Sequence, residues 1–274
     1  KKRKNIENII NKAFKTKEIN EEVRQAVLET IKMLDSGKIR ICEKINDKWT
    51  VNEYAKKAVL LSFKINNNTL IESGQENLEF GKSFWFDKVA SKFSNWTEED
   101  FKNSGLRAVP GCFVRKGCYI AKSVVIMPSF INIGAFVDEG TMIDSFVTVG
   151  SCAQVGKKCH ISSNVVIAGV LEPLQANPVI IEDNCFVGAG SLIAEGSIIG
   201  EGSILGAGTH ITSSTKIIDR ETGAVSYGKV PPYSVVVPGV KTDENGIGTQ
   251  CAIIIKKVSK ETKEKTSLND LLRP

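Results

Sequence analysis

Several features that would indicate common classes of protein are absent from the 274-residue sequence. No apolar run approaches the roughly 18 to 20 residues that a membrane-spanning helix needs, so no membrane association is expected. The seven cysteines include no Cys-x-x-Cys pair, and their number is odd. This pattern argues against a zinc site or a disulfide framework and favours free thiols in a reducing compartment.

A strong excess of one charge is also lacking, because the net charge is only +5. No aromatic residues interleave with the basic ones in a stacking pattern, so nucleic acid is not an expected partner. A small polyanionic ligand remains compatible with the composition. The basic stretch Lys1–Lys4 resembles the start of a secretory signal, but Asn5–Asn8 does not continue it with an apolar segment. We therefore expect a cytoplasmic protein.

What the sequence does contain is an apolar residue at almost every sixth position from residue 113 to residue 217. A small residue commonly follows four positions later, as at Ala135 and Cys159. A helix repeats at three and four positions and a plain strand at two, so a period of six indicates a hexapeptide β-helix. With three hexads per coil, five to six coils stacked ~4.8 Å apart form a prism roughly 25 Å tall. The expected inward residues are Phe113, Tyr119, Val125, Ile131, Val137, Ile143, Val149, Val155, Ile161 and Ile167, then Ile181, Val187, Ile193, Ile199, Leu205, Ile211 and Ile217.

The rhythm is interrupted between Ile167 and Ile181. These residues are fourteen positions apart, which is two hexads plus two residues, and the interval contains the stretch Leu171–Pro178. A loop displaced from an otherwise regular coil is more often functional than decorative. We therefore expect this loop to contribute to function.

The hexad pattern divides the chain into an N-terminal α/β domain (1–109), a β-helix domain (110–240) and a C-terminal extension (241–274). The first part has apolar residues at helical spacing and one hairpin signal. Its expected elements are helices over Asn5–Lys15, Glu21–Leu34 and Glu53–Phe63, a hairpin around Asn46-Asp47, and a helix that begins at Thr97.

The segment after the repeat is expected to cover the open end of the last coil, because exposed strand edges invite pairing with other chains. Val235–Gly239 is the expected final strand of the prism, Cys251–Val258 is a β-branched run, and Ser267–Leu272 is a short helix with a serine cap.

Aromatic residues are concentrated just before the repeat, at Phe84–Phe86 and Trp96. Two interpretations are open. In the first, the aromatic side chains pack the small domain onto the first coil. In the second, they form a ligand surface.

Asp144 is the acidic residue with the most informative expected neighbours. It follows an inward residue and so points outward, and stacking at eighteen residues puts Ile126 on one side and Ser162 on the other. A carboxylate beside an apolar residue suggests a partly covered surface and a raised pKa, as a catalytic base needs.

His160 is expected to stack over Met142, ~8 Å from Asp144 by strand geometry. The two side chains could share one site; alternatively, His160 is a corner histidine bonded to the backbone. The only other histidine, His210, falls on a different face. Two histidines on different faces fit a zinc site poorly, so no metal is expected.

The strings Gly188–Gly190 and Gly206–Gly208 lie three hexads apart and are expected to stack in adjacent coils. Small residues there would let a thin ligand approach the backbone N–H groups. The alternative is that these glycines only turn a corner of the coil.

Longer stretches are specific enough to indicate a family. A hexapeptide rhythm is shared by many acyltransferases, but these stretches resemble tetrahydrodipicolinate N-succinyltransferases in particular, and the likeness extends over nearly the whole chain. The stretches are Met127–Ala135, Val137–Asp144, Thr148–Gln154, Gly169–Pro178 and Asp219–Gly223, with Lys57–Phe63 in the helical front.

The resemblance implies a left-handed parallel β-helix and a homotrimer whose sites lie between neighbouring prisms. It implies transfer of succinyl from succinyl-CoA, a co-substrate and not a tightly bound cofactor, to the amine of the ring-opened dicarboxylate in lysine and diaminopimelate biosynthesis. By the same resemblance, Asp144 is catalytic and lies at the substrate amine, and Arg107 and Ser151 bind the substrate. The residues expected to bind the coenzyme are Gly169, Ala189, Ala207 and Lys216.

The chemistry agrees with these roles, because amine attack on a thioester needs a proton acceptor and a stabilised oxyanion. Asp144 would take or orient the proton, and Arg107 would pair bidentately with a substrate carboxylate. Backbone N–H groups near Gly188 and Ala189 would meet the thioester oxygen, and Lys216 could approach the coenzyme phosphates.

The chain departs from the family at Leu192. Gly188–Leu192 stands where the family commonly reads Gly-Ala-Arg-Ser-Glu, and leucine cannot transfer the proton that the glutamate would. Asp144 with water suffices, or Glu195 substitutes, or the chain is a weakened transferase or a trimeric scaffold. A transferase that uses acetyl-CoA or another acyl donor is the nearest alternative.

Overall fold

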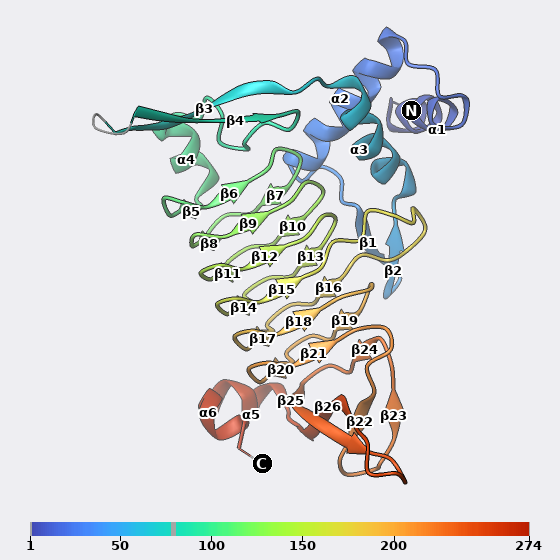
Figure 1. The fold of residues 1–274 in the computed structure, drawn as a ribbon, viewed down its shortest axis with the longest axis vertical. Helices are drawn as coiled ribbons and strands as arrows, with labels where there is room; N and C mark the ends of the chain where they lie inside the picture. Colours follow the sequence, from blue (N-terminus) through green and yellow to red (C-terminus); the bar gives the residue numbers. More distant parts are fainter. Residues whose placement is uncertain (1, 78–80, 274) are drawn as a thin grey trace.

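Three parallel sheets form the sides of a prism, which is the body of the protein. The chain passes from one sheet to the next in a left-handed parallel β-helix (Figure 1). The computed structural model describes residues 2–77 and 81–273. We name the three flat sides face A, face B and face C, in the order in which the chain visits them. Face A consists of β5 (Arg107–Ala108), β8 (Val125–Ile126), β11 (Met142–Ile143), β14 (His160–Ile161), β17 (Phe186–Val187), β20 (Ile204–Leu205) and β25 (Ser234–Thr242). Face B consists of β6 (Phe113–Val114), β9 (Phe130–Ile131), β12 (Thr148–Val149), β15 (Val166–Ile167), β18 (Leu192–Ile193) and β21 (His210–Ile211). Face C consists of β7 (Tyr119–Ile120), β10 (Phe136–Val137), β13 (Gln154–Val155), β16 (Ile180–Ile181), β19 (Ile198–Ile199) and β24 (Lys229–Val230).

Nearly all of these strands are two residues long, so the first side chain points outward and the second inward. The second residue fills the interior, as Ile161, Ile167 and Ile193 do with no exposed surface. Small residues such as Ala153 and Cys159 precede the strands and are also buried. The interior therefore alternates large and small side chains, which confirms the hexapeptide interpretation.

The first coil corrects the expected phase of the repeat. Val114, Ile120 and Ile126 are buried, whereas Phe113 is exposed at the surface. The phase changes because Ile126 and Ile131, both inward, are five residues apart, so strands pair at 17 residues there, as in Tyr119↔Phe136, and at 18 in later regular coils. The sequence could not reveal this, because both residues of each early strand are apolar.

The loop between β15 and β16 is longer than the interruption of the rhythm suggested. Gln154 on β13 pairs with Ile180 on β16, which is 26 residues away and not 18. The chain therefore takes a single step from face B to face C between Ile167 and Ile181, and the remaining eight residues are inserted, where two hexads plus two residues had been expected. We call residues 168–179 the ejected loop.

The N-terminal elements lie against face C (Figure 1). Arg40 lies 3.7 Å above the Phe136 ring and donates from Nε to Gln154 Oε1 at 3.0 Å. The elements are α1 (Lys2–Thr16), α2 (Glu21–Asp35), β1 (Cys42–Ile45), β2 (Lys48–Val51) and α3 (Glu53–Ile65), close to the expected helices and hairpin.

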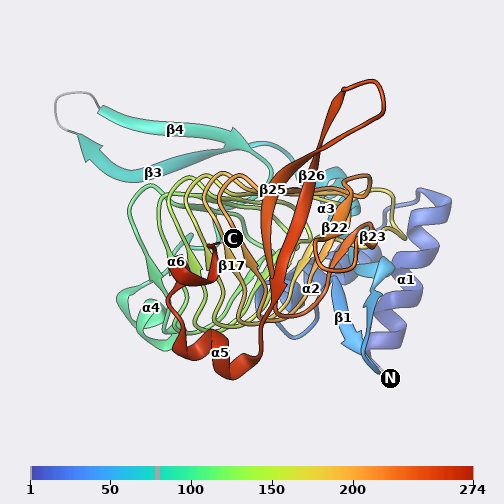
Figure 2. The ribbon, with the colours of Figure 1, turned by 90° about the horizontal axis from the view of Figure 1, so that it is seen from below.

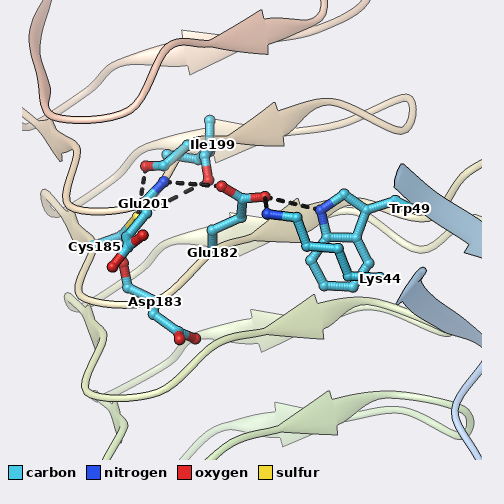
Figure 3. Close-up of polar contacts among 8 residues, drawn as sticks. Lys44, Trp49, Glu182, Asp183, Cys185, Ile199 and Glu201 are labelled. Carbon is cyan, nitrogen blue, oxygen red and sulfur yellow. Dashed lines mark hydrogen bonds and ion pairs between the residues drawn. The ribbon is translucent and has the colours of Figure 1, made fainter. Parts of the chain in front are cut away.

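Glu182 anchors the β1–β2 hairpin to the edge between faces C and A (Figure 3). One carboxylate oxygen accepts from Trp49 Nε1 at 2.9 Å and Lys44 Nζ at 3.1 Å, and the other accepts the Glu201 N–H at 3.0 Å. Burial acts to raise the pKa of Glu182, but these hydrogen bonds and the Lys44 charge outweigh it and lower the pKa. The carboxylate therefore stays ionised and joins three segments.

An antiparallel ribbon, β3 (Thr69–Asn77) and β4 (Gly81–Asp87), projects from the first coil on a different side from α1 (Figure 2). Phe84, Trp85 and Phe86 are all exposed, and Trp85 packs edge-on against Phe113 with ring centres 6.0 Å apart. Trp96 packs with Phe101 of α4 (Glu98–Ser104), which begins at a Thr97 capping box. The packing interpretation therefore holds for Trp96, which packs against the prism core. It holds only through one ring contact for Trp85, which is 45% exposed, and it does not hold for Phe84 and Phe86.

The C-terminal segment covers the last coil, as expected (Figure 1). The long strand β25 leaves face A and pairs with β26, whose other edge pairs with β22. Leu271 packs with Ile204 and Ile255 on this end of the prism. The elements are β22 (Ile217–Asp219), β23 (Val225–Ser226), β26 (Gly248–Lys257), α5 (Lys260–Lys265) and α6 (Leu268–Leu271). Within the two described ranges, no helix combines the length and apolar character that crossing a bilayer requires.

Candidate active site

One column of residues follows the edge between faces A and B, and Asp144 stands within it. Because the first coil is one residue short, the neighbour of Asp144 is Met127, and the expected neighbour Ile126 is fully buried inside the prism. Ser162 lies on the other side, as predicted. The column is Met127, Asp144, Ser162, Gly188 and Gly206.

The Asp144 carboxylate has two different contacts. Oδ1 accepts the Ser145 N–H at 2.7 Å, and Oδ2 lies 3.6 Å from His160 Nε2. Both side chains are partly exposed, and the His160 ring stacks on Phe186 with centres 5.4 Å apart. Met142 pairs with His160 as expected, but the two functional groups are closer than the predicted ~8 Å, because the side chains incline toward each other across one strand spacing.

Comparison with another corner shows which contact is special. Asp138, at the edge between faces C and A, accepts the next N–H at 2.8 Å just as Asp144 does. That bond is therefore a common feature of corners in this prism, whereas the imidazole beside Asp144 is not. In the described chain the His160 side chain contacts Asp144 and Phe186 and not a backbone group, which favours the shared-site interpretation.

The two Gly-Ala-Gly strings stack along the same edge as predicted. The Gly208 N–H donates to the Ala189 carbonyl at 2.8 Å, and a Cβ at Gly188 would lie 2.5 Å from the Ala207 nitrogen. Close stacking of the coils thus explains the glycine at 188. Ala189 and Ala207 remain exposed beside it, with only methyl groups above the backbone.

A second set of candidate residues lies on the edge between faces B and C. Ser151 and Gly169 are adjacent, since a Cβ at Gly169 would lie 2.6 Å from Ser151 Oγ. Glu195 lines a cavity of about 530 Å³ together with Gly169 and other residues of the ejected loop. The other lining residues are Ala168, Val170, Glu172, Pro173, Ala176, Asn177, Ala194 and Gly196.

Glu195 is exposed, and its carboxylate is already engaged. Oε2 accepts the Ser213 hydroxyl and the Ser213 N–H, the latter at 2.9 Å. Both hydrogen bonds lower the pKa of Glu195 because they favour its charged form. A carboxylate with a lowered pKa is a weaker proton acceptor, so the local chemistry disfavours Glu195 as a replacement for the family glutamate.

The remaining candidates lie toward the two ends of the prism. Arg107 begins the outward row of face A, which continues through Val125 and Met142 to His160. Lys216 precedes β22 at the opposite end, where its carbonyl accepts the Ala252 N–H at 2.9 Å. Face A and its edge with face B thus carry Arg107, Asp144, His160, Ala189 and Ala207, whereas Ser151, Gly169 and Glu195 lie across face B.

Curated relatives match almost the whole chain. It is 59% identical over 257 residues to the 2,3,4,5-tetrahydropyridine-2,6-dicarboxylate N-succinyltransferase of Methylorubrum extorquens, covering 92% of this chain and 90% of that protein. It is 58% identical over 252 residues to the protein of the same name from Caulobacter vibrioides, covering 92% and 91%. The chain belongs to this N-succinyltransferase family. The resemblance seen in the sequence is therefore confirmed.

Separate segments and a solved structure agree with membership of the N-succinyltransferase family. Residues 5–65 match the family described as tetrahydrodipicolinate N-succinyltransferase N-terminal, and residues 178–213 match the hexapeptide repeat of succinyl-transferase. A Campylobacter jejuni crystal structure described as a 2,3,4,5-tetrahydropyridine-2-carboxylate N-succinyltransferase has a TM-score of 0.52 at 15% identity. It covers 84% of this chain and 62% of that one, and at this identity it supports the fold alone.

The position at which we expected a departure from the family pattern lies on β18, next to the last strand of face B. Leu192 points outward on β18, between Val166 and His210 of the neighbouring strands.

The two histidines lie on different faces, as expected, and within the described ranges no three metal-binding side chains come together. Sequence reasoning missed the Met127 contact, because only the strand register reveals the five-residue step.

Proposed function

We propose that this protein transfers the succinyl group of succinyl-CoA to the amino group of ring-opened tetrahydrodipicolinate. The products are N-succinyl-2-amino-6-oxopimelate and CoA, and the reaction belongs to lysine and diaminopimelate biosynthesis in the cytoplasm. Family membership supports the reaction, and one geometric observation carries it. The Asp144 carboxylate accepts the Ser145 N–H and faces His160 at the edge between faces A and B, where Ala189 and Ala207 are exposed.

The proposed chemical step needs one proton acceptor. The substrate amine attacks the thioester carbon, Asp144 accepts the amine proton, and the tetrahedral oxyanion meets the N–H of Ala189, because the Gly188 and Gly190 N–H groups already donate to Leu205 and Ser163. As the carbon–sulfur bond breaks, the sulfur leaves with the bonding electrons and takes up a proton to give the CoA thiol. His160 Nε2, 3.6 Å from the carboxylate, lies where it can orient the carboxylate toward the substrate amine.

The proposed active form is a homotrimer with sites between subunits. Face B supports this, because its outward row includes exposed Phe113, Phe130 and Val166, which a partner would cover. The two sets of candidate residues lie on opposite sides of that face. Packing of one prism against the next brings the Asp144 edge of one subunit to the Gly169 edge of its neighbour.

In this arrangement the coenzyme lies between the two edges. Ala189 and Ala207 border it on one subunit and Gly169 on the other, while Arg107 and Ser151 hold the acceptor. The cavity beside Gly169 is lined by Glu172 and Glu195 and by no cation, so it suits the uncharged pantetheine arm. The phosphates extend toward Lys216 at the end of the prism.

Donor and acceptor can be tested together. The protein is incubated with 2-aminopimelate and either succinyl-CoA or acetyl-CoA, and thiol release is followed. Faster turnover with succinyl-CoA is expected, and faster turnover with acetyl-CoA would overturn the choice of donor.

A second function, a non-catalytic trimeric scaffold, is favoured by one observation, the apolar Leu192 in place of the family glutamate. This alternative predicts no thiol release with either donor and no shift of the melting temperature with coenzyme A. A shift together with turnover would exclude the scaffold.

A further inference from the structure

Lys56 is a buried cation for which the proposed chemistry has no use. Its side chain is among the largest fully buried ones, with 0% of its surface exposed. Its neighbours on α3, Ala55 and Val59, belong to the apolar cluster of the N-terminal helices. Burial lowers the pKa of Lys56, as expected for an ammonium group removed from water.

The single partner of this ammonium among the described residues is a backbone carbonyl of the ejected loop. Lys56 Nζ donates to the Ala176 oxygen at 2.6 Å, and no carboxylate lies within ion-pair distance of it in the described ranges. An aliphatic side chain would fill the same space without the cost of burying a charge. The hydrogen bond to the loop is therefore the feature that distinguishes lysine from an apolar residue here.

The ejected loop has few other polar ties to the prism. At its start the Val170 N–H donates to the Ser151 carbonyl at 3.2 Å, and at its end the Val179 carbonyl accepts from the Gln154 N–H at 2.9 Å. Between them, the Ala176 N–H donates within the loop to Pro173. Across residues 171–178 the bond from Lys56 is thus the one described hydrogen bond that comes from outside the loop.

The tethered segment forms one wall of the cavity beside Gly169. Glu172, Pro173, Ala176 and Asn177 line it from the loop, opposite Glu195 on the next coil. The position of this wall sets the width of the cavity. Lys56 on α3 is thus bonded to a wall of this cavity, although no α3 residue lines the cavity itself.

We infer that Lys56 is a positioning residue that holds the ejected loop at the width required by the acyl-coenzyme arm. The inference rests on the proposed function for the identity of the ligand, and on the geometry alone for the tether. Loss of the tether weakens coenzyme binding and leaves the acceptor site and the chemical step unaffected.

The test compares Lys56→Met with Lys57→Met. Methionine keeps the length and apolar stem of lysine but donates no hydrogen bond. Lys57 is the matched control, because it neighbours Lys56 on α3 but donates to Asn11 Oδ1 at 2.7 Å, away from the loop. For Lys56→Met we expect the KM for succinyl-CoA to rise about tenfold, with kcat and the KM for 2-aminopimelate changed less than about twofold. Lys57→Met should leave all three values unchanged.

Amide hydrogen exchange tests the tether without any reaction. Exchange across residues 171–178 should accelerate about tenfold in Lys56→Met and not in Lys57→Met, while the coil strands stay protected. Unchanged exchange in Lys56→Met would overturn the tether. A fall in kcat with no rise in the KM for succinyl-CoA, or a rise in the KM for the acceptor instead, would overturn the positioning role.

Wild-type protein supplies the remaining controls. Coenzyme A should slow exchange across residues 171–178, and the absence of any slowing would overturn the inference even where Lys56→Met does not fold. If the wild type releases no thiol from succinyl-CoA, the proposed function fails, while faster loop exchange in Lys56→Met would still establish the tether.

Discussion

Face B and face C carry outward rows of similar apolar character, yet only face C is covered by the chain itself. Phe136 on face C is 8% exposed beneath Arg40, whereas Phe130, on the preceding strand of face B, is 38% exposed. The repeat therefore supplies outward apolar side chains around the prism. The segments outside the repeat, here the N-terminal elements, decide which of these side chains are exposed to solvent.

The uncovered face also separates the two groups of candidate residues. Asp144 and His160 belong to the side of face A, whereas Ser151, Gly169 and the ejected loop lie at the edge with face C. The covered face serves stability, and the bare face is the surface through which a second prism would complete the site. Substitutions at the two faces should therefore have different consequences.

The largest effect is expected at the edge that the bare face presents to its neighbour. Asp144→Asn removes the proton acceptor without changing shape, so turnover should fall about 10³-fold while the oligomeric state is unchanged. Thiol release and sedimentation measure the two properties. Asp138→Asn is the matched control, because Asp138 makes the same corner hydrogen bond at 2.8 Å but lies on the edge between faces C and A. Equal losses in both variants would contradict a catalytic role for Asp144.

A charge placed on the bare face should separate the subunits. Val166→Lys puts an ammonium group into an apolar contact, so we expect dissociation and at least about a 100-fold loss of turnover at low protein concentration. Analytical ultracentrifugation and thiol release provide the measurements. Val225→Lys is the control, since Val225 is 40% exposed against 38% for Val166 but lies in the C-terminal segment. A Val166→Lys variant that remains a fully active trimer would contradict the assignment of face B as the interface.

A substitution where the N-terminal elements join the prism should lower the free energy of unfolding and leave turnover unchanged. Glu182→Gln replaces a carboxylate that accepts three hydrogen bonds, so the free energy of unfolding should fall by about 1.5–3 kcal/mol, measured by urea denaturation. Because the folded pKa of Glu182 lies below its ordinary value of 4.5, this contribution is complete above that pH and is lost as the pH falls through the lowered pKa. Glu201→Gln, at an exposed carboxylate nearby, should have little effect. A difference between wild type and Glu182→Gln that persists unchanged at pH 2 would contradict the assignment.

The smallest effect is expected at Glu195. Its carboxylate is exposed and engaged by Ser213, so Glu195→Gln should change turnover by less than about threefold. Thiol release across pH 6–9 measures this. A loss comparable to that of Asp144→Asn would identify Glu195 as the replacement for the family glutamate.

Much of the site could be predicted from the sequence because the repeat converts spacing into position. The stacking of Met142 on His160, and of the two Gly-Ala-Gly strings, follows from counting hexads. The neighbour of Asp144 could not be found this way, because the five-residue step after Ile126 lies among apolar residues that satisfy either phase. The eight inserted residues of the ejected loop were likewise hidden, since a loop has no period.

By itself, the sequence determined the solenoid, its approximate number of coils and the family, because a side chain every sixth residue can be buried in one kind of column and long strings are specific. The tertiary structure decided which face the helices cover, how closely Asp144 and His160 approach, and that Lys56 reaches the ejected loop 120 residues away. Those contacts depend on surfaces that meet only after the coils have stacked, and no local pattern in the chain records them.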